Sequence, residues 1–144
     1  MPTRKISEVV RNQRILTTTG AITVREACRQ MAENRVGSVM IVGQDGRLTG
    51  IFTERDALTR VLATGLDPDT TRLDSVMTAD PSTISVTRPL GHALHLMYDG
   101  GFRHVPVVQD GKPVGMVSAR DALGPEMVAF EEELEKREII TELL

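Results

Sequence analysis

The chain contains the stretch Gly50-Ile51-Phe52-Thr53-Glu54-Arg55-Asp56-Ala57-Leu58 and repeats it 65 positions later as Gly115-Met116-Val117-Ser118-Ala119-Arg120-Asp121-Ala122-Leu123. A repeat of this length predicts two structural units, each too small to bury its apolar faces alone. Because the repeated polar residues stand where a strand is expected to meet a helix, they indicate ligand chemistry as well as packing.

The similarity between the two copies extends into the flanking sequence. Residues 6–10 match 73–77, residues 39–42 match 105–108, and the turn at 44–46 matches the turn at 109–111. We therefore expect a first unit within residues 1–66, a linker and a second unit within 67–124, and a separate tail over 125–144.

Both units show the same pattern of secondary structure. Apolar residues at helical spacing predict one helix that includes Val24 and Met31, and another that includes Leu90 and Met97. We expect Gly37 and the pair Gly100-Gly101 to end these helices. Apolar runs joined by an Asp-Gly turn then predict a β-hairpin, and a second helix begins at Thr53 or Ser118. The expected fold is α+β, with a β-α-β-β-α order in each unit.

Composition excludes several classes of protein. The 144-residue chain is 40% hydrophobic and 26% charged, which is typical of a globular domain. Its net charge of −3 and its scarce aromatic residues disfavour nucleic acid as a partner. No apolar run has the length of a membrane span, and no signal segment is evident. The single cysteine, Cys28, is expected to be a buried, inert thiol and favours a cytoplasmic location.

The tail over 125–144 carries seven Glu residues against Lys136 and Arg137. Pro125 suits the first turn of a helix, and Phe130 and Leu134 belong to an incomplete apolar stripe. Two interpretations stay open: a helix packed on its own domain, or a contact with a second chain.

The repeated polar motif has a purely structural interpretation. Thr53 and Asp56 are spaced as a helix-capping pair, and so are Ser118 and Asp121. Capping does not explain Arg55 and Arg120, whose positive charges oppose the helix dipole at its N-terminal end. An anion bound there would make each arginine favourable, because amide groups and a guanidinium would converge on a phosphate. A nearby acid can accept hydrogen bonds from a ribose diol. Capping and nucleotide binding both remain possible.

With these residues the chain resembles a tandem pair of cystathionine β-synthase (CBS) domains, the Bateman module. The resemblance covers residues 6–124, and further matches are the segments 82–86 and 101–108. It implies two units packed through their sheets about a pseudo-twofold axis. It also implies two clefts that bind adenosine nucleotides, commonly AMP or ATP and sometimes S-adenosylmethionine.

The resemblance assigns roles to individual residues. Asp56 and Asp121 correspond to the ribose-binding acid, and Thr53 and Ser118 to its hydroxyl partner. Arg55 and Arg120 match positions that can approach phosphates, and Arg103 and His104 offer further donors in the second unit. The remaining implied binding positions are Thr17, Ser38, Met40, Thr83, Val105 and Pro106. Because His104 and Pro106 replace Ser38 and Met40, the two clefts are not expected to be equivalent, and the second unit is expected to hold the better site.

Two functions from different classes fit this sequence. The leading hypothesis is a non-catalytic module that binds AMP, ADP or ATP and modulates a partner protein of unknown identity. The alternative is a structural or dimerisation module with empty clefts. An enzyme is disfavoured because no nucleophile–base pair is evident. His92 and His95 lie three apart on a predicted helix, but with no third ligand they are not expected to bind metal.

A homodimer is also expected. Four short helices on two small sheets leave apolar faces that one chain of this length is not expected to cover, and closed twofold symmetry is the default for soluble homo-oligomers. The apolar residues concerned are Leu58, Val61, Leu62, Leu90 and Leu94.

Overall fold

The computed structural model describes residues 4–122 and 125–143. The first half of the chain contains, in order, α1 (Ile6–Val10), β1 (Thr17–Thr18), α2 (Val24–Asn34), β2 (Ser38–Val42), β3 (Leu48–Thr53), α3 (Glu54–Asp56) and the π-helical turn η1 (Ala57–Leu62). The second half contains the 3₁₀ turn η2 (Leu73–Ser75), β4 (Thr78–Ala79), α4 (Leu90–Gly100), β5 (His104–Gln109), β6 (Lys112–Ser118), the 3₁₀ turn η3 (Ala119–Ala122) and α5 (Pro125–Leu143). The helix expected after Ser118 is therefore only a short turn within the described residues, and residues 123 and 124, where the second unit is expected to end, lie outside them.

The strands form two sheets. The larger sheet has the order β1-β2-β3-β4, with β1 parallel to β2 and the other pairs antiparallel. The smaller sheet is the β5–β6 hairpin, and Ile84 adds an isolated parallel bridge to Val107 at its edge. In each unit, a segment before the first long helix thus pairs in parallel with the first hairpin strand.

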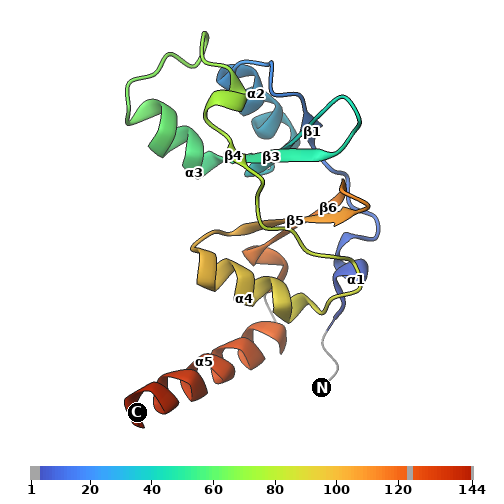
Figure 1. The fold of residues 1–144 in the computed structure, drawn as a ribbon, viewed down its shortest axis with the longest axis vertical. Helices are drawn as coiled ribbons and strands as arrows, with labels where there is room; N and C mark the ends of the chain where they lie inside the picture. The colour runs from blue at the N-terminus through green and yellow to red at the C-terminus, as the bar shows by residue number, and fades with distance from the viewer. Residues whose placement is uncertain (1–3, 123–124, 144) are drawn as a thin grey trace.

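The two sheets lie between two layers of helices (Figure 1). Helices α2 and α3 lie on the outer side of the larger sheet, and α4 lies on the outer side of the β5–β6 hairpin. A backbone hydrogen bond of 2.9 Å from the amide of Leu48 to the carbonyl of Gly111 joins the two hairpins. The expected α+β fold of two related units packed through their sheets, with a C-terminal helix, is confirmed.

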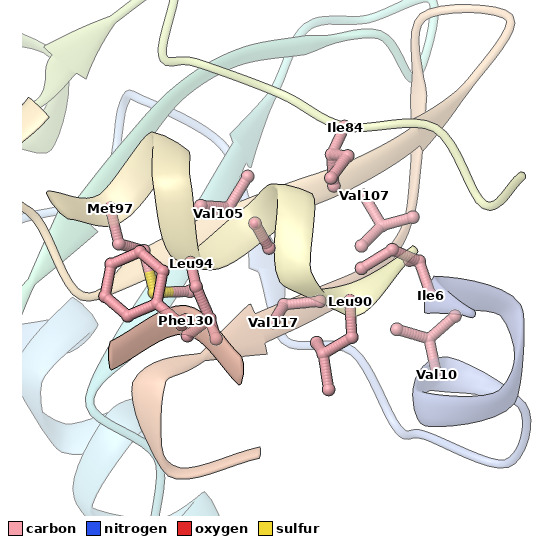
Figure 2. Close-up of a cluster of buried hydrophobic side chains, with 11 residues drawn as sticks. Ile6, Val10, Ile84, Leu90, Leu94, Met97, Val105, Val107, Val117 and Phe130 are labelled. Atoms are coloured by element: carbon pink, nitrogen blue, oxygen red, sulfur yellow. The ribbon is translucent and has the colours of Figure 1, made fainter. Parts of the chain in front are cut away.

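The units exchange their leading segments. Ile6 and Val10 of α1 are buried in the same cluster as Leu90 of α4 and Val117 of β6 (Figure 2). Conversely, Leu73 and Val76, which precede the second unit in sequence, are buried with Val24 and Phe52 of the first. Strand β4 likewise pairs with β3, so Thr78 lies opposite Ile51. Each unit therefore completes its core with the segment that precedes the other unit.

The repeated glycines allow this exchange. A Cβ on Gly115 would lie 2.6 Å from the Cβ of Val10, and a Cβ on Gly50 would meet the side chain of Met77. Val10 and Met77 occupy matching positions in the repeat, so the two contacts are pseudo-symmetric. A side chain on either strand would push the exchanged segment away.

Replacing Gly115 with alanine should therefore lower the free energy of unfolding by about 1–3 kcal/mol, the usual cost of overpacking. Val10 cannot yield easily, because its Cβ is fixed to the backbone of α1. Gly91→Ala is the matched control, because a Cβ at Gly91 meets nothing within 4 Å. Urea unfolding should show a lower midpoint for Gly115→Ala and an unchanged or higher one for Gly91→Ala. Equal midpoints for both variants would contradict the proposed close approach.

The acidic tail forms the helix α5 and packs on α4. Phe130 is buried in the core of the second unit, and its ring meets those of His95 and Tyr98 edge to face, with centroids 5.1 and 5.8 Å apart. At the start of α5, the buried carboxylate of Glu126 accepts a 2.7 Å hydrogen bond from Nε of Arg4. The start of the tail thus packs on its own domain, as one of the two interpretations expected, and a contact with a second chain stays a prediction.

Candidate functional site

The repeated acids cap the turns that follow their strands. In the first unit, Oδ2 of Asp56 accepts a 3.0 Å hydrogen bond from the amide of Thr53, and the Thr53 hydroxyl accepts one of 3.2 Å from the amide of Asp56. In the second unit, Oδ2 of Asp121 accepts from the amide of Ser118 at 2.8 Å and from its hydroxyl at 3.3 Å. The capping interpretation of the motif is therefore present in the structure.

Capping occupies only one oxygen of each carboxylate. Oδ1 of Asp56 lies 3.6 Å from Nε of Arg60, and Oδ1 of Asp121 makes no hydrogen bond or ion pair to the residues that the structure describes. A carboxylate has room for about four hydrogen bonds. Each acid can therefore hold its cap and still accept a bond from a ligand, so the two interpretations of the motif are compatible.

A first cleft of about 1160 Å³ opens beside Asp56. Its walls come from the end of β3 and α3 in the first unit, from the linker after β4, and from the segment between α4 and β5. The side chains or backbone that line it include Thr53, Glu54, Arg55, Asp56, Arg60, Asp80, Ser82, Gly101, Arg103 and His104.

A second cleft of about 380 Å³ opens beside Asp121. It is built from matching parts of the chain: the end of β6 and η3, the segment before β1, and the segment between α2 and β2. The residues that line it include Arg14, Leu16, Arg35, Ser38, Met40, Glu54, Arg103, His104, Ser118, Arg120 and Asp121. Glu54, Arg103 and His104 line both clefts, so the two clefts adjoin at these residues.

Most of the residues expected at the site line one cleft or the other. Four do not, namely Thr17, Thr83, Val105 and Pro106. Thr17 and Thr83 directly follow Leu16 and Ser82, which do line the clefts. Val105 is fully buried in the core, so only its backbone could face a ligand. Ligand contact by any of these residues stays a prediction.

The structure adds charged residues that the sequence analysis did not single out. Arg60 lies one helical turn after Asp56, and Asp80 follows β4, which joins the first sheet only through the exchange of segments. Arg14 and Arg35 lie far from the repeated motif in sequence. The i, i+4 spacing of Asp56 and Arg60 was the only signal that could have found one of these residues.

The clefts differ in charge. Three arginines and three carboxylates line the first cleft, whereas four arginines and two carboxylates line the second. In the first cleft, Nη1 of Arg55 donates to the carbonyl of Gly101 at 3.4 Å, at the negative end of α4, and Arg60 donates to the carbonyl of Val76. The contact of Arg55 with α4 gives that arginine a role that needs no ligand. The second cleft is the more cationic.

His104 lies at the junction of the clefts and is partly buried. Burial lowers the pKa of His104 from its ordinary value of 6.5, while Glu54 opposes the shift. The folded protein therefore favours the neutral imidazole, which can donate a hydrogen bond without carrying a charge.

The lowered pKa of His104 predicts a loss of stability in weak acid. The unfolded chain binds the proton first, so this contribution is complete above pH 6.5 and is lost as the pH falls through the lower folded pKa. Thermal unfolding at pH 7.5 and 5.5 should show a larger drop in Tm for the native protein than for His104→Gln. The difference between the two drops isolates the contribution of His104. An identical drop in both proteins would show that burial of His104 does not control the change in stability between pH 7.5 and 5.5.

Other candidate groups have ordinary structural roles. Nε2 of His95 lies 2.6 Å from a carboxylate oxygen of Glu133 on α5. Within 4–122 and 125–143, no cluster of three His, Cys, Asp or Glu residues could hold a metal ion. Burial raises the pKa of the Cys28 thiol, which disfavours the reactive thiolate.

None of the helices in the described part of the chain is long and apolar enough to cross a membrane.

The sequence pattern of the CBS domain matches residues 6–63 and 73–124. The chain belongs to the CBS domain family. Each matched range contains one copy of the repeat, and the resemblance expected from the motif is confirmed.

Relatives and solved structures agree with this assignment. The CBS domain-containing protein CBSCBSPB2 of Arabidopsis thaliana is 37% identical over 114 residues, which are 79% of this chain and 21% of that protein. The chain thus spans about a fifth of that relative's length. The CBS domain protein PAE2072 from Pyrobaculum aerophilum, solved in complex with AMP, is 30% identical with a TM-score of 0.79, over 92% of this chain and 99% of the other. The CBS domain pair of MJ0100, solved with 5-methylthioadenosine and S-adenosyl-L-methionine, is 25% identical with a TM-score of 0.74, over 83% and 93% of the two chains.

Proposed function

We propose that this CBS pair is a non-catalytic regulatory module that binds an adenosine nucleotide, AMP, ADP or ATP, in the clefts between its two units. The observation that carries the proposal is the pair of Asp121 and Arg120 in the second cleft. Asp121 retains one carboxylate oxygen beyond its cap, and Arg120 has no hydrogen bond or ion pair to the described residues. An acceptor for ribose and a donor for phosphate thus line one cavity.

The arrangement of the clefts supports a regulatory role. Each cleft takes its walls from both units, so a bound nucleotide would contact both and fix their relative position. A ligand that binds one arrangement of the units more tightly than another shifts the population toward it. We propose that a partner protein recognises this change. Complexes of PAE2072 with AMP and of MJ0100 with related adenosine compounds make the adenosine moiety the expected common element.

We further propose that the protein forms a homodimer. Val61, Leu90 and Leu94, which were expected to need a partner, are buried within the single chain. Leu58 and Leu62 on η1 are 59% and 65% exposed and remain available for an interface. Self-association would also let nucleotide binding change the relation between two chains. A cytoplasmic location suits the single cysteine, Cys28.

The alternative function, a dimerisation module with empty clefts, is favoured by one observation. Arg55 binds the end of α4, and both acids cap their turns. The charged residues of the repeated motif in the first cleft therefore have structural roles that need no ligand. The two functions differ in what they predict for nucleotide binding.

Calorimetric titration with AMP, ADP, ATP, NAD, S-adenosylmethionine and cyclic dinucleotides separates them. The regulatory proposal predicts saturable binding of at least one adenosine compound and a rise in Tm at saturating ligand. Light scattering on the same samples measures the oligomeric state with and without ligand. A dimer that binds none of these compounds would favour the structural alternative.

A further inference from the structure

Arg35 adopts an unusual backbone conformation at the end of α2. Its φ and ψ are 55° and 42°, in the left-handed region, and its amide donates back to α2. The amide of Val36 also donates to the carbonyl of Met31, which completes a glycine-type helix end. The expectation that Gly37 ends this helix is therefore wrong.

The second unit uses glycine at the matching position. Gly101 ends α4 with a φ of 72°, and the amides of Gly101 and Phe102 both donate to the carbonyl of Met97. Glycine adopts this conformation without a steric penalty, whereas a residue with a Cβ does not. Arginine at this place makes the fold less stable than glycine would, so its side chain is expected to have a use.

Arg35 lines the second cleft, and its side chain is not used by the fold. It makes no hydrogen bond or ion pair to residues 4–122 or 125–143. The guanidinium groups of Arg14, Arg103 and Arg120 likewise make no hydrogen bond or ion pair to the described residues. These four guanidinium groups outnumber the two carboxylates of that cleft, Glu54 and Asp121, so the cleft attracts a ligand of high negative charge. Gly101, the counterpart of Arg35, lines the first cleft and offers no charge there.

We propose that Arg35, together with Arg14, makes the second cleft selective for the polyphosphate of a nucleotide, so that this cleft prefers ATP or ADP over AMP and adenosine. The first cleft, with balanced charges, then takes adenosine compounds of low negative charge. Asp121 and Arg120 would hold the ribose and the first phosphate, and Arg35 and Arg14 the phosphates beyond it. The inference rests on the proposed nucleotide binding and specifies its ligand class.

Arg35→Gly separates this role from a structural one, because glycine suits the backbone while removing the charge. Calorimetry with adenosine, AMP and ATP should show that the native second cleft binds ATP at least about tenfold more tightly than adenosine, the scale expected of charge-assisted hydrogen bonds. Arg35→Gly should reduce this preference by about tenfold, leave adenosine affinity within about twofold, and keep or raise Tm. Asp121→Ala identifies the binding event that belongs to the second cleft.

Arg29→Ala is the matched control, because it removes one positive charge from the same helix outside both clefts. It should leave the preference for ATP unchanged. If Arg35→Gly leaves the ratio of ATP affinity to adenosine affinity unchanged, the proposed selectivity of Arg35 is wrong, while the proposed nucleotide binding still holds. Failure of the native protein to bind adenosine, AMP or ATP at all would instead overturn the proposed function and this inference with it.

Discussion

Replacing Asp121 with alanine should weaken nucleotide binding at the second cleft by roughly 10- to 100-fold, the range expected when a hydrogen bond to a charged group is lost. The carboxylate is the acceptor expected to bind the ribose, and no other carboxylate except Glu54 lines that cleft among the described residues. The double variant Asp56→Ala, Asp121→Ala should lose measurable binding at both clefts. Isothermal titration calorimetry measures both effects directly.

These variants also remove a cap, so a control must separate local unfolding from ligand loss. Glu8 caps α1 through a 3.2 Å hydrogen bond from the amide of Lys5 and lies outside both clefts. Glu8→Ala should lower stability by about 1 kcal/mol, as cap removal usually does, and leave nucleotide affinity unchanged. Unchanged affinity in the double aspartate variant would refute the assigned ribose site.

Truncating Phe130 to alanine should lower the free energy of unfolding by about 3 kcal/mol or more, the usual cost of removing a buried aromatic side chain. Phe130 is only 9% exposed, and its ring joins α5 to Leu94 and Met97 of the core (Figure 2). Nucleotide affinity should change by less than about tenfold, because none of the α5 residues whose side chains the structure describes lines either cleft. Chemical unfolding and calorimetry on the same variant measure the two quantities.

Val128→Ala provides the matched control on the same helix, since Val128 is 57% exposed. Its stability should stay within about 0.5 kcal/mol of the native protein. If Phe130→Ala stays folded and as stable as Val128→Ala, α5 contributes less to the fold than its packing indicates. If Phe130→Ala is folded but loses nucleotide binding outright, the tail has been assigned the wrong role.

Local patterns predicted the elements of this fold. The apolar spacing around Val24 and Leu90, the Asp-Gly turns and the capping pair of Thr53 and Asp56 are short-range features, and each is present in the structure. The repeat predicted two units because similar local patterns form similar local structures.

Long-range placement was not predictable in the same way. The repeat assigns Ile6 to the first unit by sequence, yet Ile6 completes the core of the second. The exchange depends on the close approach of Val10 to Gly115, which no single segment reveals. The burial of Phe130 between α4 and α5 likewise depends on how the tail folds back.

The same difference between short-range patterns and long-range placement applies to the residues of the candidate site. The repeated acids, hydroxyls and arginines were identified from the motif, because each copy holds them within four positions. Arg14 was missed because its segment reaches the second cleft through the exchange of leading segments, in which the neighbouring Gln13 bonds to Met116 of β6. Arg35 was missed because the end of α2 reaches that cleft only through the packing of the two units. The left-handed conformation of Arg35 also has no signature in the residue type itself.

A crystal structure of the protein with AMP tests the central claim, that adenosine nucleotides bind in the clefts between the units. The account predicts AMP in at least one cleft, with a ribose hydroxyl about 2.7 Å from the carboxylate of Asp121 or Asp56. AMP bound outside both clefts, or clefts left empty at a concentration that saturates binding in solution, would contradict it.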